Sequence, residues 1–176
     1  MPERAARLAG EFVELGILTK DHRGAKRVQP IDLPSATRVL PTPTPFRLPT
    51  LLLYTPQVLY SCSLADRRLG RDSLEKTVCA FVSLTAHVED ADFDIDRAAR
   101  LVAIFNKLRL FYPRPYLCLF DSLALLDFLV QHGLSPRWIF GVRSEPFEAH
   151  CWLQAHDVVL NDSIERVSSY LPIMST

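Results

Sequence analysis

The sequence lacks an excess of charge of either sign and a long hydrophobic run. Lysine plus arginine and aspartate plus glutamate each total 20, so the formal net charge is zero. An electrostatic nucleic-acid binder would carry a basic surplus. No segment approaches the ~18 uninterrupted apolar residues of a membrane helix, and the amphipathic start is unlike the apolar core of a signal peptide. We therefore expect neither a nucleic-acid partner nor a membrane span.

Common cofactor and disulfide motifs are missing as well. The chain has no Gly-x-x-x-x-Gly-Lys-[Ser/Thr] loop for nucleotide phosphates and no Cys-x-x-Cys pair for zinc. The four cysteines, which are Cys62, Cys79, Cys118 and Cys151, show nothing of a secreted disulfide scaffold. The sequence thus predicts no cofactor, no metal and a reduced, cytoplasmic environment.

Proline is abundant, and it is concentrated in one region. Seven of the 13 prolines lie between Pro30 and Pro56, a density that excludes regular structure except at edges. We interpret residues 30–56 as a linker that lies extended across a surface. Residues 1–29 contain an amphipathic helix over 3–17, and residues 57–176 form the main domain.

In the main domain, helical patterns come first and strand patterns follow. Helices are predicted over residues 72–87, 94–110 and 119–130. The apolar face of the second helix is formed by Ala99, Val102, Phe105 and Leu108. Strands are predicted over residues 138–142, 147–154 and 157–161. This order indicates an α+β domain in which helices pack against a small antiparallel sheet.

Cys118 stands at the start of the third predicted helix. The segment after it is strongly apolar as far as Val130, follows the Pro-rich turn at 112–115 and has Gly133 as a stop signal. A cysteine in a first helical turn lies near the positive end of the helix dipole and near unpaired backbone N–H groups, which favour the thiolate. The same N–H groups are suited to stabilise an oxyanion on a substrate carbonyl.

His150 and Asp162 follow Cys118 at intervals of 32 and 12 residues. A hairpin centred on His156 places both six residues from the turn, which makes them cross-strand neighbours with Cβ atoms roughly 5 Å apart. Such a contact fixes the imidazole tautomer while the other nitrogen faces a thiolate. The three residues are a candidate catalytic triad. The competing interpretation is structural, because a lone cysteine in an apolar helix or a histidine beside Trp152 is more often part of the core.

Four other side chains near the candidate triad are interpreted one by one. Trp152 shares the strand face of His150 and is predicted to bind substrate and shield the site, or to fill the core. Asp121 lies in the first turn of the Cys118 helix and is predicted to aid capping or to touch substrate. Cys151 points to the strand face opposite His150 and is interpreted as a core cysteine. His156 is expected to be solvated. A zinc site formed by His150, Cys151 and His156 is rejected, because adjacent residues on opposite strand faces cannot converge on one ion.

Five blocks of sequence resemble the lasso peptide biosynthesis B proteins, which are leader peptidases of the transglutaminase-like cysteine protease superfamily. The blocks stand in the family's order and spacing, and they contain all three triad positions. They are Cys118–Leu125, Trp138–Arg143, Pro146–Trp152, Val158–Asp162 and Tyr170–Ile173. The resemblance is dense over about residues 112–174 and looks closest to the microcin-processing type.

The resemblance implies a transglutaminase-like, papain-like core and a cysteine peptidase that removes the leader from a lasso precursor peptide during the maturation of a ribosomal peptide product. By position, Cys118 would be the nucleophile, His150 the general base and acid, and Asp162 the orienting carboxylate. The implied cut follows a leader segment with threonine in its penultimate position. The implied partners are the precursor's leader region and an asparagine-synthetase-like lasso cyclase, in which any ATP dependence would reside.

One part of the family pattern is missing. Members with both halves carry an N-terminal leader-recognition module, and residues 1–29 resemble only its last helix. A truncated start, a degenerate module and a separate leader-recognition protein as a further partner all stay open. Two other functions also stay open: a transglutaminase-like acyltransferase with an amine acceptor, and a catalytically silent adaptor between precursor and cyclase.

Overall fold

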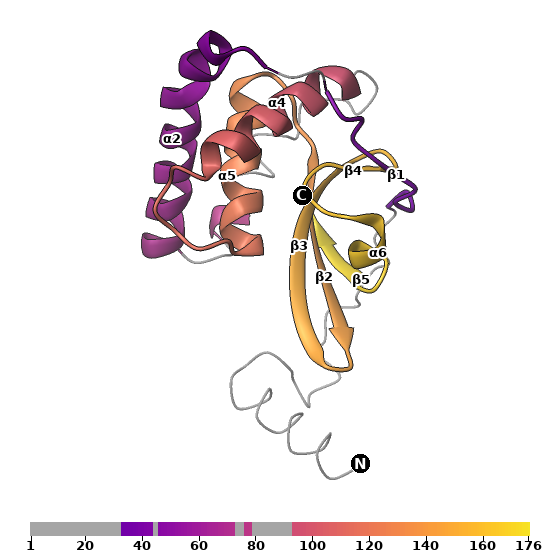
Figure 1. Cartoon of the computed structure of the whole chain (residues 1–176). Coiled ribbons are helices and arrows are strands. Elements are labelled where there is room, and N and C mark those ends of the chain that lie inside the picture. The colour runs from indigo at the N-terminus through magenta and orange to yellow at the C-terminus, as the bar shows by residue number, and fades with distance from the viewer. Residues whose placement is uncertain (1–32, 44–45, 73–75, 79–92) are drawn as a thin grey trace. The chain divides into compact units, whose positions relative to one another are not determined.

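The computed structural model describes residues 33–43, 46–72, 76–78 and 93–176. The chain divides into two compact units, Met1–Pro30 and Ile31–Thr176. The helix predicted over 3–17 and most of the helix predicted over 72–87 lie outside the described residues. In the described part of the second unit, three long helices accompany a mixed β-sheet (Figure 1). No helix among these residues is long and apolar enough to cross a membrane.

The central helix of the second unit is α5 (Cys118–Gln131). Nine of its 14 residues are buried, because α2 and α4 cover one side of the helix and strand β3 covers another (Figure 1). The helix ends as predicted, with Gly133 at φ 75° and the Leu134 N–H donating to the Leu129 carbonyl at 3.0 Å. This is the glycine-terminated arrangement that satisfies the last helical carbonyls.

Helix α4 (Ile95–Arg109) also forms where its sequence predicts. The side chain of Asp94 accepts a hydrogen bond from the Arg97 N–H at 2.9 Å and so caps the first turn. The predicted apolar face is buried in full, with all four of its residues in the core: Ala99, Val102, Phe105 and Leu108. The spacing of apolar residues therefore identified both the helix and the side that it buries.

Helix α2 (Leu48–Arg71) corrects the predicted linker. Its first third lies inside residues 30–56, so the prediction of an extended linker up to residue 56 is wrong. Pro49 is tolerated because it occupies the first turn. Pro56 lies inside the helix, where the lost hydrogen bond costs about 3 kcal/mol. The helix forms because packing of its buried stripe outweighs this cost; the stripe consists of Val58, Ser61, Cys62 and Ala65.

In the described residues, five strands form one sheet in the order β1-β4-β3-β2-β5. Their bounds are Arg38–Val39, Arg137–Ser144, Phe147–Ala155, Val158–Val159 and Leu171–Ser175, numbered along the chain. Strands β2 to β5 pair antiparallel, whereas β1 pairs parallel with β4. The prediction of a purely antiparallel sheet is therefore wrong at one edge, where the predicted linker supplies β1. A salt bridge of 2.6 Å between Arg38 and Asp157 fastens this edge to the β3–β4 turn.

A second, smaller core lies on the sheet face away from α5, beside the one-turn helix α6 (Ile164–Val167). It is built from Ile139, Trp152, Val159, Val167 and Tyr170. Gly141 of β2 lies beneath it, since a Cβ atom there would come within 2.9 Å of the Tyr170 Cβ and 3.0 Å of the Trp152 ring. The aromatic rings can therefore lie flat against the strand only while this position is glycine.

We predict that Gly141→Ala destabilises the domain, because the new methyl group meets the Tyr170 Cβ and the indole ring, neither of which can withdraw without moving its strand or the core. The expected loss is ~1–3 kcal/mol in the free energy of unfolding, measured by urea denaturation. Gly70→Ala in α2 is the matched control: nothing lies within 4 Å of its Cβ position, and alanine is the better helix former. Equal urea midpoints for the two variants would contradict the packing argument.

Candidate active site

Cys118 is the first residue of α5 and is partly exposed. Its thiol therefore lies at the end of the helix where the dipole and unpaired N–H groups favour an anion. Hydrogen bonding with the Cys151 thiol and with the His150 imidazole lowers the pKa of Cys118 well below its usual range, and burial opposes this only in part. The side chain is accordingly a thiolate near neutral pH, the form in which cysteine is nucleophilic.

The loop that leads into Cys118 is fixed by a buried arginine. Arg109 is only 1% exposed, and its guanidinium lies over the rings of Tyr116 and Phe120 at 4.9 Å from each centroid. It donates hydrogen bonds of 3.1, 3.0 and 3.2 Å to three loop carbonyls, those of Tyr112, Arg114 and Pro115. The guanidinium thus holds the backbone from α4 to the N-terminus of α5 in one conformation.

Asp121 completes this arrangement from the first turns of α5. One of its oxygens accepts a hydrogen bond from Arg109 Nε at 2.6 Å, and the other accepts from the backbone N–H of Leu117 at 2.7 Å. The predicted capping role is therefore present, because the carboxylate satisfies the N–H of the N-cap residue. Asp121 also lines the cleft beside Cys118. Both of its oxygens are already hydrogen-bonded within the protein.

The structure brings His150 and Asp162 into direct contact. The distance from His150 Nε2 to Asp162 Oδ2 is 2.5 Å, and the Asp162 Oδ1 accepts a hydrogen bond of 2.8 Å from the Ser163 N–H. The carboxylate is thus oriented by its own main chain. Since Nε2 is engaged with Asp162, the Nδ1 atom of the ring is the nitrogen left for Cys118. The three predicted triad residues therefore meet in the order that the sequence predicts.

This contact arises differently from the prediction. The β3–β4 turn contains two residues, and the ladder pairs Gln154 with Val159, so the predicted register is wrong by one residue and the ladder does not pair His150 with Asp162. Strand β4 ends at Val159, and the chain then bends. The Asn161 Oδ1 accepts a hydrogen bond of 2.8 Å from the Leu153 N–H. This side-chain bond anchors the bend that brings Asp162 to the imidazole.

Two aromatic rings enclose the His150 side chain, which is 5% exposed. The Trp152 ring stacks at 6.0 Å between centroids, and the Tyr170 ring lies at 5.1 Å. Trp152 shares the strand face of His150, as predicted, but it is 2% exposed and belongs to the second core. It supports the imidazole from behind and does not line the cleft, which favours the core interpretation over the predicted role in substrate binding.

His150 receives opposing electrostatic influences. Burial by itself lowers the pKa of the imidazole, but hydrogen bonds with Cys118 and with the Asp162 carboxylate outweigh burial, so the pKa of His150 is raised. The nearby Arg166 guanidinium acts in the opposite direction. A raised imidazole pKa beside a lowered thiol pKa describes a thiolate–imidazolium pair.

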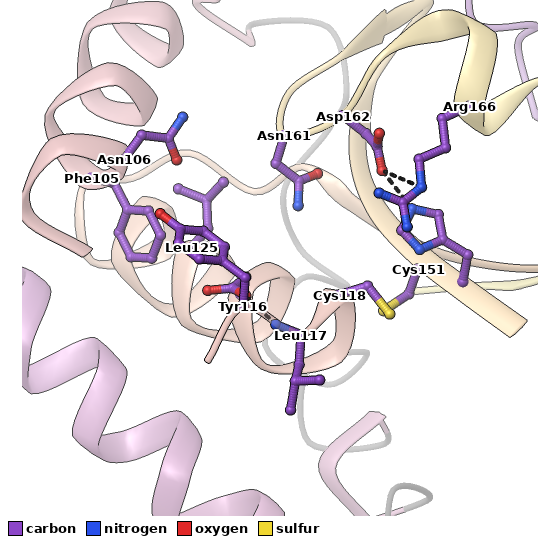
Figure 2. Close-up of a pocket in the computed structure, with 12 residues that line it drawn as sticks. Phe105, Asn106, Tyr116, Leu117, Cys118, Leu125, Cys151, Asn161, Asp162 and Arg166 are labelled. Carbon is purple, nitrogen blue, oxygen red and sulfur yellow. Dashed lines mark hydrogen bonds and ion pairs between the residues drawn. The ribbon is translucent and has the colours of Figure 1, made fainter. Parts of the chain in front are cut away.

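Cys151 is a buried core cysteine on the strand face opposite His150, as predicted. This face is directed toward α5, and the Cys151 side chain also lines the same cleft as Cys118. The two sulfur atoms lie side by side (Figure 2). His150 and Cys151 both reach Cys118 because β4 pairs with β3 only at Gln154 and Ala155 in the described part of the chain. The cleft lies along the uncovered edge beyond these residues.

The cleft has a volume of about 220 Å³ and contains polar residues that the sequence analysis missed. They are Asn106, Asn161 and Arg166, together with the exposed ring of Tyr116 (Figure 2). Because the Asn161 Oδ1 is engaged with Leu153, its NH₂ group faces the cleft interior (Figure 2). The sequence offered one signal for Asn161, namely that it directly precedes Asp162. A strand pattern does not reveal that a main-chain N–H fixes the Asn161 side chain.

A second cavity of about 410 Å³ adjoins the first. The two share Asn106, Asn161 and Asp162 as a common wall. The remaining lining is mostly small and apolar: Val39, Leu40, Pro41, Thr42, Pro43, Ala99, Val102, Ala103, Val159 and Leu160. A chain-like molecule whose reactive group lies at Cys118 can thus extend past the two asparagines into an apolar space.

Among the described residues, no group of three or more His, Cys, Asp and Glu side chains is arranged to hold a metal ion. His156, the third residue of the rejected zinc site, is exposed at the tip of the β3–β4 turn with φ 51°. It is therefore solvated, as predicted, and is far along β3 from the cleft.

A family model described as the transglutaminase-like superfamily matches residues 61–175. The match covers more than half of the chain, so this protein belongs to the transglutaminase-like superfamily. This superfamily includes cysteine proteases, so membership suggests cysteine-protease or acyltransferase-type activity, and the α+β architecture agrees with the match. Searches of curated proteins and of solved structures found no match.

We predict that Arg109→Met displaces the loop before Cys118, because Asp121 loses its ion-pair partner and three loop carbonyls lose their donor. Removing one partner of a buried ion pair costs about 3–5 kcal/mol, which a urea denaturation series should measure. Arg100→Met, on the exposed side of the same helix, removes the same charge without these bonds and should leave the midpoint nearly unchanged. Equal effects of the two substitutions would contradict the role of Arg109.

The pH dependence of Cys118 alkylation by iodoacetamide tests whether the pKa of the Cys118 thiol is lowered. A lowered thiol pKa means that the thiolate is already present below neutral pH, so the rate should change little from pH 7 to 8, whereas a free thiol of pKa ~8.5 gains almost tenfold there. His150→Ala should move the midpoint upward, since one hydrogen bond to the thiolate is lost. His156→Asn, at an exposed turn, should not. A wild-type midpoint at or above pH 8.5 would contradict the assignment.

Proposed function

We propose that this protein is a cysteine peptidase that removes the leader from a lasso peptide precursor, with Cys118 as nucleophile, His150 as general base and acid, and Asp162 as orienting carboxylate. The observation that carries the proposal is the set of contacts at the N-terminus of α5. There a thiol with a lowered pKa meets an imidazole whose far nitrogen is held at 2.5 Å from a carboxylate. This is the arrangement that acyl transfer to a thiol requires.

In the acylation step, the Cys118 thiolate attacks the carbonyl carbon of the scissile amide and a C–S bond forms. The carbonyl oxygen becomes an oxyanion, for which the first-turn N–H groups of α5 and the NH₂ group of Asn161 are the nearby donors. The imidazolium of His150 then gives its Nδ1 proton to the departing nitrogen, the C–N bond breaks, and the amine leaves. A thioester on Cys118 remains.

In the deacylation step, neutral His150 takes a proton from water, and the resulting hydroxide attacks the thioester carbon. The C–S bond breaks, the leader is released as a carboxylic acid, and the thiolate–imidazolium pair returns. Asp162 stays ionised throughout and stabilises the positive imidazole at Nε2. No cofactor takes part in these steps, and any ATP dependence would belong to the partner synthetase. A reduced compartment such as the cytoplasm keeps the thiolate available.

The adjoining cavities support a peptide as the acyl donor. A bound peptide would run from Cys118 past Asn106 and Asn161, whose amides suit the hydrogen-bonding groups of a peptide backbone. The apolar cavity beyond them would then take a side chain near the scissile bond. A threonine in the penultimate leader position, which the family resemblance implies, has the branched shape and modest size that such a space accepts.

The lasso assignment is supported by the five sequence blocks that resemble the B proteins, which include every residue of the proposed triad. The partners that go with this assignment are the leader of a precursor peptide and an asparagine-synthetase-like cyclase. A separate leader-recognition protein is a further partner if residues 1–29 do not bind the leader.

The main alternative keeps the triad and replaces water with an amine in the second step. A transglutaminase-like acyltransferase would use Cys118, His150 and Asp162 identically, because the acceptor is selected by access to the thioester. A silent adaptor is the alternative from another class; the lowered pKa of Cys118 speaks against it, since an adaptor needs no thiolate.

The deciding experiment is mass spectrometry of the cognate precursor incubated with the protein, alone and with the leader-recognition protein and cyclase. We expect a leader fragment from wild type and none from Cys118→Ala. His150→Ala should lower the rate ~10²–10⁴-fold, and Asp162→Asn should lower it less because its role is orientation. His156→Asn, which changes a histidine in the exposed turn after the same strand, is the matched control and should process normally.

The products also separate the alternatives. A leader that ends in a free carboxylate identifies hydrolysis, whereas a leader joined to an added amine identifies the acyltransferase. Full processing by Cys118→Ala would refute the nucleophile and support the adaptor.

A further inference from the structure

We propose that Cys151 is a positioning residue of the active site, whose thiol remains protonated and donates a hydrogen bond to the Cys118 thiolate. The inference rests on the proposed role of Cys118 as nucleophile, and it adds a second thiol to the His150 and Asp162 machinery. Cys151 is 3% exposed, lines the cleft and lies with its sulfur beside that of Cys118 (Figure 2).

Ser122, the neighbour of Cys151 on the side away from Cys118, bears on which of the two cysteine sulfurs is protonated. Ser122 Oγ lies 3.3 Å from Cys151 Sγ, and a serine has a single hydrogen to donate. That hydrogen is directed to the Cys118 carbonyl, at 2.6 Å. The same Oγ accepts a bond of 2.9 Å from Trp138 Nε1. Ser122 therefore has no hydrogen left with which to stabilise a Cys151 thiolate. The single hydrogen of the Cys151 thiol goes to the stronger of its two neighbouring acceptors, the Cys118 thiolate, and not to the neutral Ser122 hydroxyl.

The protonated state of Cys151 follows from its surroundings. The adjacent Cys118 sulfur raises the pKa of Cys151 far above its usual range, and burial raises it further. Two thiolates side by side in a buried site would repel each other, so the pair carries one negative charge and one hydrogen. The charge resides on Cys118, which has the helix N-terminus and the imidazole as further partners.

The backbone of Cys151 is also a hydrogen-bond donor to Cys118. Its N–H points out of the uncovered edge of β3 and hydrogen-bonds the Cys118 sulfur. Substitution of Cys151 leaves this main-chain donor in place and removes only the side-chain donor. The side chain can therefore be tested separately, by comparing a variant without a donor with one that retains a hydroxyl.

The test is the pH profile of Cys118 alkylation by iodoacetamide in the full chain, read by mass spectrometry of the Cys118 peptide, for wild type, Cys151→Ala and Cys151→Ser. The other titratable groups around Cys118 are the same in all three proteins: Arg109, Tyr116, Asp121, His150, Asp162 and Arg166. We expect the midpoint of Cys151→Ala to rise by about one pH unit, which is the scale of one hydrogen bond to a charged group. The hydroxyl of Cys151→Ser should keep the midpoint within a few tenths of a unit of wild type.

Precursor processing gives the second readout. Because Cys151→Ala lacks the hydrogen bond to the Cys118 thiolate, it should process the precursor most slowly at low pH. Its rate should recover at high pH, where the Cys118 thiolate forms without that bond. A wild-type alkylation midpoint in Cys151→Ala would overturn the inference, and so would a processing loss that is equal at every pH, which indicates structural damage. Failure of the proposed function is seen separately, because wild type would then leave the precursor uncut while its alkylation profile stayed as described.

Discussion

The geometry of the candidate active cleft depends on the burial of α5. This helix is apolar on nearly all sides, so it is stable only between the α2 and α4 helices and the face of β3. Its burial fixes where its N-terminus emerges, at the uncovered edge of the sheet. Cys118 is the residue at that point, and the thiol therefore meets side chains of β3 that are distant in sequence. The Arg109 and Asp121 pair then secures the entering loop, so that the helix start is as firmly held as the helix itself.

The charged side chains around the cleft each lie close to a group of opposite charge. Behind Cys118, the buried guanidinium of Arg109 is balanced by Asp121 and by loop carbonyls. In front of it, the imidazole of His150 lies between the thiol and Asp162, with the Arg166 guanidinium 4.0 Å from the same carboxylate. Because each permanent charge has a nearby partner, the charge that changes during the proposed reaction is the one shared by the thiol and the imidazole. A site of this kind needs little reorganisation when a thioester forms.

Membership of the superfamily suggests cysteine-protease or acyltransferase-type chemistry, and the residues that line the cleft bear on the choice of substrate. A Cys-His-Asp triad can pass an acyl group either to water or to an amine, so its geometry does not select the acceptor. The apolar cavity behind Asn106 and Asn161 favours an extended acyl donor, and the B-protein resemblance supplies the proposed identity of that donor. The Cys151 thiol lies beside Cys118, the proposed nucleophile, and its proposed hydrogen bond would serve the reaction with either acceptor.

Much of the fold and of the site follows from local patterns in the sequence. The α4 and α5 helices, the glycine stop, the β2–β3–β4 strands and the shared face of His150 and Trp152 depend on periodicity and end signals, which act within a few residues. The linker prediction failed at α2, since local proline rules carry no information about the packing of Val58 and Cys62 that outweighs Pro56. The register failed by one residue, because it depends on how many residues the turn takes.

By itself, the sequence determined which residues are chemically equipped to act: a cysteine at a helix start, a histidine on a half-covered strand and an aspartate after the next strand. The tertiary structure decided how they meet. The bend anchored by Asn161 on the Leu153 N–H carries Asp162 to His150, and the uncovered edge of β3 admits both His150 and Cys151 to Cys118. These contacts depend on where strands end and on which main-chain groups still lack a hydrogen-bond partner. Such long-range constraints do not show in the hydrophobic periodicity of the sequence.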